Sequence, residues 1–85
     1  MEGRLYSEDR LVESLEFYTE QINKHPDESL LYLDRAQLYW MMKKHQYSLV
    51  DVRKALALNT NLFEAHYLIG VILDWNTASN VPGLI

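Results

Sequence analysis

The side chains best suited to chemistry in this chain are three histidines and two carboxylates, and their spacing does not assemble a catalytic set. His25 precedes a proline, His45 falls at an expected turn, and His66 lies in a helical stretch. No two histidines have the i, i+4 spacing of paired metal ligands on a helix. Asp34 or Asp51 near His66 would suggest acid–base chemistry, but the sequence offers no nucleophile and no glycine-rich phosphate loop. We expect a non-catalytic chain without metal or cofactor, with His25 solvated and His66 partly buried.

One basic cluster invites a nucleic-acid interpretation, which the overall charge disfavours. The cluster consists of Lys43, Lys44, His45, Arg53 and Lys54. The chain carries 12 acidic and 8 basic residues, a formal net charge of -4, whereas phosphate binding requires a basic surface. A helix C-terminus followed by a solvated face accounts for the cluster more simply. Nucleic acid is therefore not an expected partner, although an RNA-binding helical repeat stays as a disfavoured alternative.

The elements expected to position these residues are helices. Apolar residues recur at steps of three and four between short breaker segments, as at Leu11, Leu15, Tyr18 and Ile22. No stretch alternates with period two for long enough to form a strand. The pattern predicts an all-α chain whose short connections make consecutive helices antiparallel. The four expected helices are 9–24, 28–43, 46–58 and 62–75.

Capping residues are expected at two of these helix starts. Asp27, after a proline, is placed to cap the second helix. Asn61 with Glu64 three residues later is a variant of the capping box for the fourth helix.

Membrane and secretory segments are not evident. The longest apolar runs, at 38–42 and 69–73, fall far short of the roughly 20 residues of a spanning helix. The segment 1–4 lacks the apolar core of a signal peptide. The chain has no cysteine, which excludes disulfides and zinc fingers. We expect no membrane association and a cytoplasmic location, with a nuclear one as the alternative.

An internal repeat organises the chain. When the sequence is shifted by 34 residues, small residues fall on small ones and large apolar residues on large apolar ones. The pairs are Ser14 with Ser48, Leu15 with Leu49, Ile22 with Leu56, Ala36 with Gly70, Leu38 with Ile72, and Tyr39 with Leu73.

This period and its helix–turn–helix units resemble the tetratricopeptide repeat (TPR) family. The complete unit is 29–62, in which segment 33–39 is similar to the family's N-R-A-x-x-Y form and segment 54–59 to its K-A-L-x-L-x-P ending. Thr60 replaces the closing proline. The residues that match the family pattern are Tyr32, Arg35, Ala36, Tyr39, Ser48, Val52 and Ala55. Lys43 stands where the family usually has glycine, so this turn must avoid positive φ or accept strain.

The resemblance implies a right-handed α-solenoid of antiparallel helix–turn–helix repeats, with about four helices here. Residues 1–76 would form the repeat region and 77–85 a flexible tail. Within that region, 9–28 would hold the second helix of a partial repeat, 29–62 the full repeat, and 63–76 the first helix of another partial repeat. Since a solenoid needs about three repeats to be stable alone, we expect an excerpt or isoform of a longer protein, or ends completed by another chain.

The resemblance also implies a protein-binding function. TPR modules bind peptides or helices on the concave face of their first helices, and Trp and Tyr are common binding hot spots. The candidate partner-binding residues by projection are Leu30, Leu33, Gln37, Trp40, Met41, Tyr67, Val71 and Trp75. The alternative is that this surface packs against a neighbouring helix or a second subunit, as a structural segment of a longer superhelix or a self-associating fragment.

The carboxylate clamp of chaperone-adaptor TPRs is missing. That clamp consists of Lys, Asn, Asn, Lys and Arg, and the first lysine has no counterpart here. The other positions hold Gly3, Asp34, Glu64 and Leu68. Two positions are acidic and repel a carboxylate, so we expect no binding to acidic chaperone tails.

Overall fold

The chain folds into four consecutive α-helices, as the hydrophobic spacing predicts. The computed structural model describes the backbone of residues 8–80 and the side chains of residues 9–75, and this part contains no strand. The helices are α1 (Glu8–Lys24), α2 (Ser29–Met41), α3 (His45–Leu58) and α4 (Phe63–Asn80).

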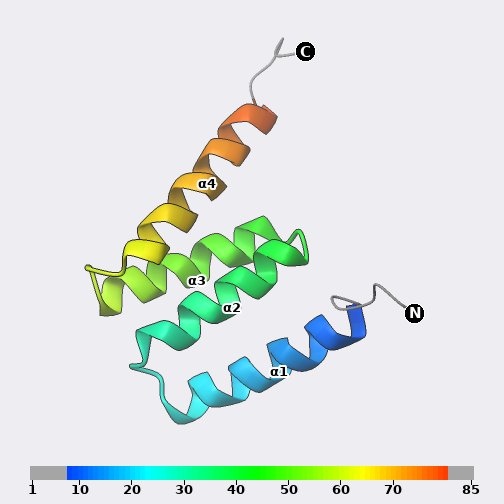
Figure 1. The fold of residues 1–85 in the computed structure, drawn as a ribbon, viewed down its shortest axis with the longest axis vertical. Coiled ribbons are helices and arrows are strands. Elements are labelled where there is room, and N and C mark those ends of the chain that lie inside the picture. Colours follow the sequence, from blue (N-terminus) through cyan, green and yellow to red (C-terminus); the bar gives the residue numbers. More distant parts are fainter. Residues whose placement is uncertain (1–7, 81–85) are drawn as a thin grey trace.

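The helices lie in chain order across a flat array (Figure 1). Its principal extents are 45 × 40 × 17 Å. Helices α2 and α3 form the most closely packed pair, while α1 packs on α2 and α4 packs on α3. Figure 1 shows α4 diverging from α3 toward the C-terminus. Each helix is therefore held mainly by its neighbours in sequence, an arrangement with predominantly local contacts.

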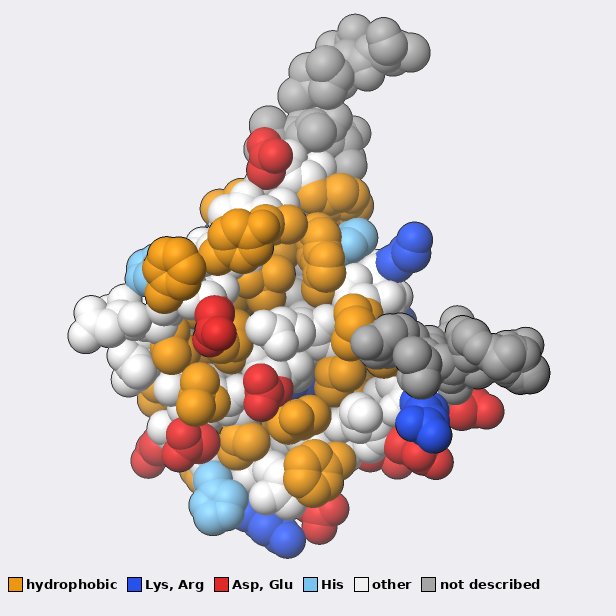
Figure 2. All heavy atoms as spheres, viewed as in Figure 1, with side chains coloured by type: hydrophobic (Ala, Val, Ile, Leu, Met, Phe, Trp, Pro, Cys, Tyr) orange, Lys and Arg blue, Asp and Glu red, His pale blue; other side chains and the backbone are white. Residues whose placement is uncertain are grey.

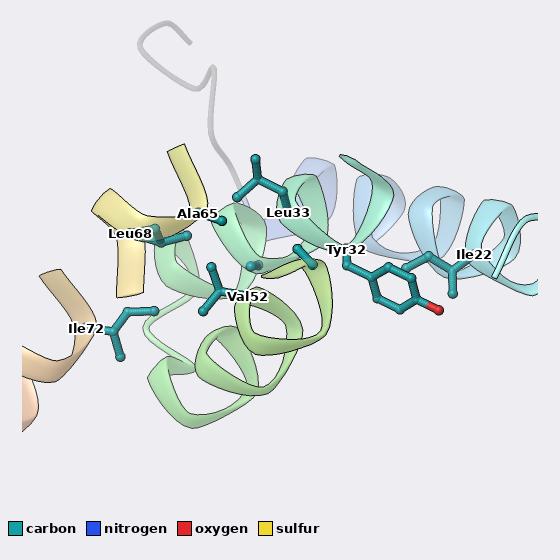
Figure 3. Close-up of a cluster of buried hydrophobic side chains, with 9 residues drawn as sticks. Ile22, Tyr32, Leu33, Val52, Ala65, Leu68 and Ile72 are labelled. Carbon is teal, nitrogen blue, oxygen red and sulfur yellow. The ribbon is translucent and has the colours of Figure 1, made fainter. Parts of the chain in front are cut away.

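Small side chains let α2 and α3 approach closely. Ala36, Ser48 and Ala55 are fully buried with Val52 between the two helices. The Ser48 hydroxyl donates a hydrogen bond to the backbone carbonyl of Ala36 at 2.7 Å, so the one polar group of this contact is satisfied. Around it lies a core cluster drawn from all four helices (Figure 3). Its members are Ile22, Tyr32, Leu33, Ala36, Val52, Ala55, Ala65, Leu68 and Ile72.

A partly buried ion pair between Arg35 and Asp51, with a hydrogen bond to Thr19, joins three helices beside this core. The Arg35 guanidinium donates to both carboxylate oxygens of Asp51, with Nε–Oδ2 at 2.7 Å and a second nitrogen–Oδ1 distance of 2.9 Å. A third nitrogen donates to Thr19 Oγ1 at 3.2 Å. Asp51 is 5% exposed and Arg35 18% exposed. This bidentate geometry is the strong form of the charge-assisted hydrogen bond and holds α2 against α3, while the bond to Thr19 adds α1.

Helix α4 extends further than its sequence pattern predicts. It continues to Asn80, past the expected end at 75, so the first part of the segment expected to be a flexible tail is helical. Asn, Thr and Ser each lower helix propensity by only tenths of a kcal/mol, which does not end a helix that is already formed. The rest of that segment, 81–85, lies outside the described residues.

Neither expected capping residue is in position. Glu28, with extended backbone, precedes α2, and its side chain makes no capping hydrogen bond. Asp27 is one residue too early to serve as the cap. Helix α4 begins after Leu62, and the backbone N–H of Asn61 donates to the side-chain oxygen of Asn59 at 3.0 Å. Local Asx geometry in this turn therefore takes the place of the expected capping box.

Candidate binding pocket at the helix ends

A pocket of about 710 Å³ opens where the ends of several helices meet. It is lined by Leu11, Trp40, Met41, Lys43, His45 and Trp75. These residues come from the start of α1, the last turn of α2, the following turn, the first turn of α3 and the C-terminal half of α4. The volume lies within the usual range of ligand pockets, and the walls are mainly apolar and aromatic.

An aromatic cluster forms the pocket wall. The His45 ring lies between the two indoles, with ring centroids 4.3 Å from Trp40 and 3.9 Å from Trp75. Trp75 is 39% exposed and Met41 is 44% exposed. A partner side chain can therefore reach both residues from solvent, and indoles that expose this much apolar area are frequent binding hot spots.

The turn that places His45 has a strained residue at its centre. The N–H of Lys44 donates to the Tyr39 carbonyl at 2.8 Å, and the N–H of Lys43 donates to the Trp40 carbonyl at 3.0 Å. This is the Schellman pattern, which needs a left-handed residue. Lys43 adopts it with φ of 63°, a conformation that favours glycine. Of the two outcomes expected for this turn, the structure shows the strained one. It also ends α2 at Met41 rather than at 43.

A second feature is an acidic pair, formed by Asp34 of α2 and Glu64 of α4. Partial burial, and then the nearby charge of Glu64, raise the pKa of Asp34. The neighbouring cation, Arg35, is committed to Asp51, and that hydrogen bond raises the pKa of its guanidinium. Among the side chains of residues 9–75, none forms a salt bridge with Asp34 or Glu64.

The structure brings three of the eight candidate partner-binding residues into the pocket: Trp40, Met41 and Trp75. Leu30, Gln37 and Tyr67 are exposed elsewhere, and Val71 is half-buried. The prediction for Leu33 was wrong, because this residue is 2% exposed and packs in the core, where a partner cannot reach it. Helical projection placed it on the binding face because projection of one helix does not show that Leu33 joins a buried cluster with residues of α3 and α4.

Three pocket residues were not among the candidates: Leu11, Lys43 and His45. Leu11 belongs to a helix expected on the other side of the repeat, so projection of the first helices did not include it. His45 stands where the repeat pattern expects an aromatic residue after the turn. That position was the available signal that the imidazole would pack with neighbouring rings.

The remaining candidates for chemistry lie apart. Asp51 pairs with Arg35, and His66 Nε2 lies 2.8 Å from the Thr60 carbonyl oxygen, so the structure does not join these two residues in an acid–base pair. His25 is exposed as expected, whereas His66 is exposed and not partly buried. His66 makes a hydrogen bond to the α3–α4 turn in place of core contacts.

Three of the four clamp positions named above have a clear place in the structure. Leu68 is buried in the core, and Asp34 with Glu64 forms the acidic pair. Gly3 lies outside the described residues. Within the described residues, no helix is long and apolar enough to cross a bilayer. No protein-family model matches the chain.

Proposed function

We propose that this chain is a non-catalytic protein-interaction module that binds a segment of a partner protein on the face formed by α2 and α4. The observation that carries the proposal is the pocket walled by Trp40, His45 and Trp75, in which the Trp75 side chain is open to solvent. Such a pocket suits one apolar anchor side chain of a peptide or helix.

The architecture proposed for the module is a TPR-like right-handed solenoid. The 34-residue period supports this, as does the order in which the helices pack on their sequence neighbours. The small residues of the repeat pattern, Ala36, Ser48 and Ala55, are all fully buried, as close packing of a helix pair requires. The acidic pair Asp34 and Glu64 favours a partner other than an acidic chaperone tail.

Affinity capture with matched variants tests the proposal. Trp75→Ala removes an exposed wall of the pocket, whereas Phe17→Ala removes a side chain of α1 that is 55% exposed and lies outside the pocket. We expect a partner captured by the wild-type chain and by Phe17→Ala, and lost with Trp75→Ala. Circular dichroism must show that both variants keep wild-type helicity. Equal capture by the two variants would contradict the proposal.

Exposed apolar side chains favour a second candidate, self-association as a structural segment. Phe17, Val50, Phe63 and Tyr67 are each more than half exposed, on α1, α3 and α4. Large exposed apolar groups of this kind mark interfaces when they gather in patches. Sedimentation equilibrium distinguishes the two candidate functions. An apparent mass that equals that of the monomer at every concentration would contradict self-association and favour the interaction module.

A further inference from the structure

The acidic pair lies on the same helix faces as the pocket, since Met41 follows Asp34 by about two turns of α2 and Trp75 follows Glu64 by about three turns of α4. Leu33 of α2 and Ala65 of α4 belong to one buried cluster (Figure 3). Asp34 and Glu64 lie beside this contact, close enough for the charge of Glu64 to act on the Asp34 carboxyl. On the side of the molecule that Figure 2 shows, acidic side chains lie among hydrophobic ones.

Among the side chains of residues 9–75, no cation forms a salt bridge with either carboxylate of the acidic pair. Arg35 is occupied by Asp51, and the Lys54 ammonium lies over the Tyr32 ring, 5.8 Å from its centroid. Two like charges near each other on a partly buried surface destabilise the folded state. A cation supplied from outside would reverse this effect, because it would attract both carboxylates at once.

The opposite end of the face has the opposite charge. Lys43 lines the pocket, next to His45 and the two indoles. A basic side chain that directly adjoins the anchor would meet the Lys43 ammonium, whereas a basic side chain at a distance would meet the acidic pair. The face therefore discriminates by the sign of a charge and by its separation from the anchor.

The helix geometry gives that separation. The distance from Asp34 to Trp40 along the axis of α2 is about 9 Å at 1.5 Å per residue. The distance from Glu64 to Trp75 along the axis of α4 is about 16 Å. An extended chain rises about 3.3 Å per residue, so these lengths correspond to roughly three to five residues.

We infer that the partner is a cationic segment: one apolar side chain enters the pocket, and a Lys or Arg about three to five residues away in an extended chain pairs with Asp34 and Glu64. This inference rests on the proposed function and adds the charge and spacing of the partner. Arg is the better-suited cation, because its planar guanidinium can bind both carboxylates.

Capped synthetic peptides test the inference, with a leucine anchor and a neutral Ala/Gly/Ser background. One peptide carries Arg about four residues from the anchor, a second carries Glu there, and a third carries Arg directly beside the anchor. The chain has two tryptophans, both in the pocket, so their indole N–H resonances report occupancy by NMR even at millimolar affinity. Low salt is used because the interaction is exposed to screening.

We expect the distant-Arg peptide to bind about tenfold more tightly than the Glu peptide, which corresponds to about 1.4 kcal/mol. The adjacent-Arg peptide should bind no more tightly than the Glu peptide. In the double variant Asp34→Asn/Glu64→Gln the preference should disappear while the leucine anchor still shifts the indole resonances. Equal affinity of the Arg and Glu peptides for the wild-type chain would overturn the cationic inference and leave the pocket as a binding site. Absence of any indole shift with every peptide would overturn both proposals.

Discussion

Removing the carboxylate of Asp51 should destabilise the fold more than any other single loss of charge in the described part of the chain. Asp51 is 5% exposed and accepts two hydrogen bonds from Arg35 at 2.7 and 2.9 Å. Asp51→Asn keeps the side-chain shape but leaves the half-buried guanidinium without its counter-charge. Breaking such a pair by removing one partner costs about 3 kcal/mol or more.

That cost is large for a chain of this size. Native stabilities of roughly 0.05–0.15 kcal/mol per residue correspond to about 4–13 kcal/mol for 85 residues. In a domain of 60–100 residues, each kcal/mol shifts Tm by about 4–8 °C, so a loss of 3 kcal/mol lowers it by about 12–24 °C. Urea unfolding followed by circular dichroism measures the change as a lower midpoint at unchanged slope.

Two further variants separate the ion pair from general effects. Glu16→Gln removes an exposed carboxylate of α1 and should change stability by less than about 0.5 kcal/mol. The double variant Arg35→Met/Asp51→Leu removes both charges and should be less destabilised than Asp51→Asn, since no unpaired charge stays buried. A loss below about 1 kcal/mol for Asp51→Asn, or a double variant no better than the single one, would refute the reasoning.

Two other predictions concern the turn and the acidic pair. Lys43→Gly relieves the left-handed backbone at φ 63° and should raise stability in urea unfolding by about 0.5–1 kcal/mol, whereas Lys43→Ala should give no gain. Asp34→Asn should raise Tm at neutral pH, because burial and Glu64 raise the pKa of Asp34 in the folded state. A raised folded-state pKa contributes stability below the unfolded pKa of about 3.9, and this contribution disappears as pH rises through the folded pKa. The gain from Asp34→Asn should therefore vanish near pH 3, and a gain of equal size at pH 3 and pH 7 would contradict this explanation.

The hydrophobic spacing predicted the helices well because each helix buries one stripe against its neighbours in the chain. The starts of the helices agree with the sequence pattern to within one residue. The end of α4 did not follow the pattern, because residues with modest helix propensity extend a helix without any apolar signal.

The candidate site could be predicted only in part. Trp40, Met41 and Trp75 follow from helical projection. Leu33 shows the limit of projection, since its burial depends on packing with residues of other helices. The bond between Arg35 and Asp51 joins residues on different helices, and no periodicity within one helix reveals it. Periodicity also does not reveal that Leu11 lines the pocket, because this depends on the packing of α1 on α2.

The central claim is that the pocket between Trp40, His45 and Trp75 holds an apolar anchor of a partner, and one measurement tests it most directly. The dissociation constant of the distant-Arg peptide is measured for the wild-type chain, Trp75→Ala and Phe17→Ala by NMR titration of backbone amides. We predict an affinity at least about tenfold weaker for Trp75→Ala and unchanged for Phe17→Ala, as expected when a single aromatic hot spot is removed. The same dissociation constant for all three proteins would contradict the claim.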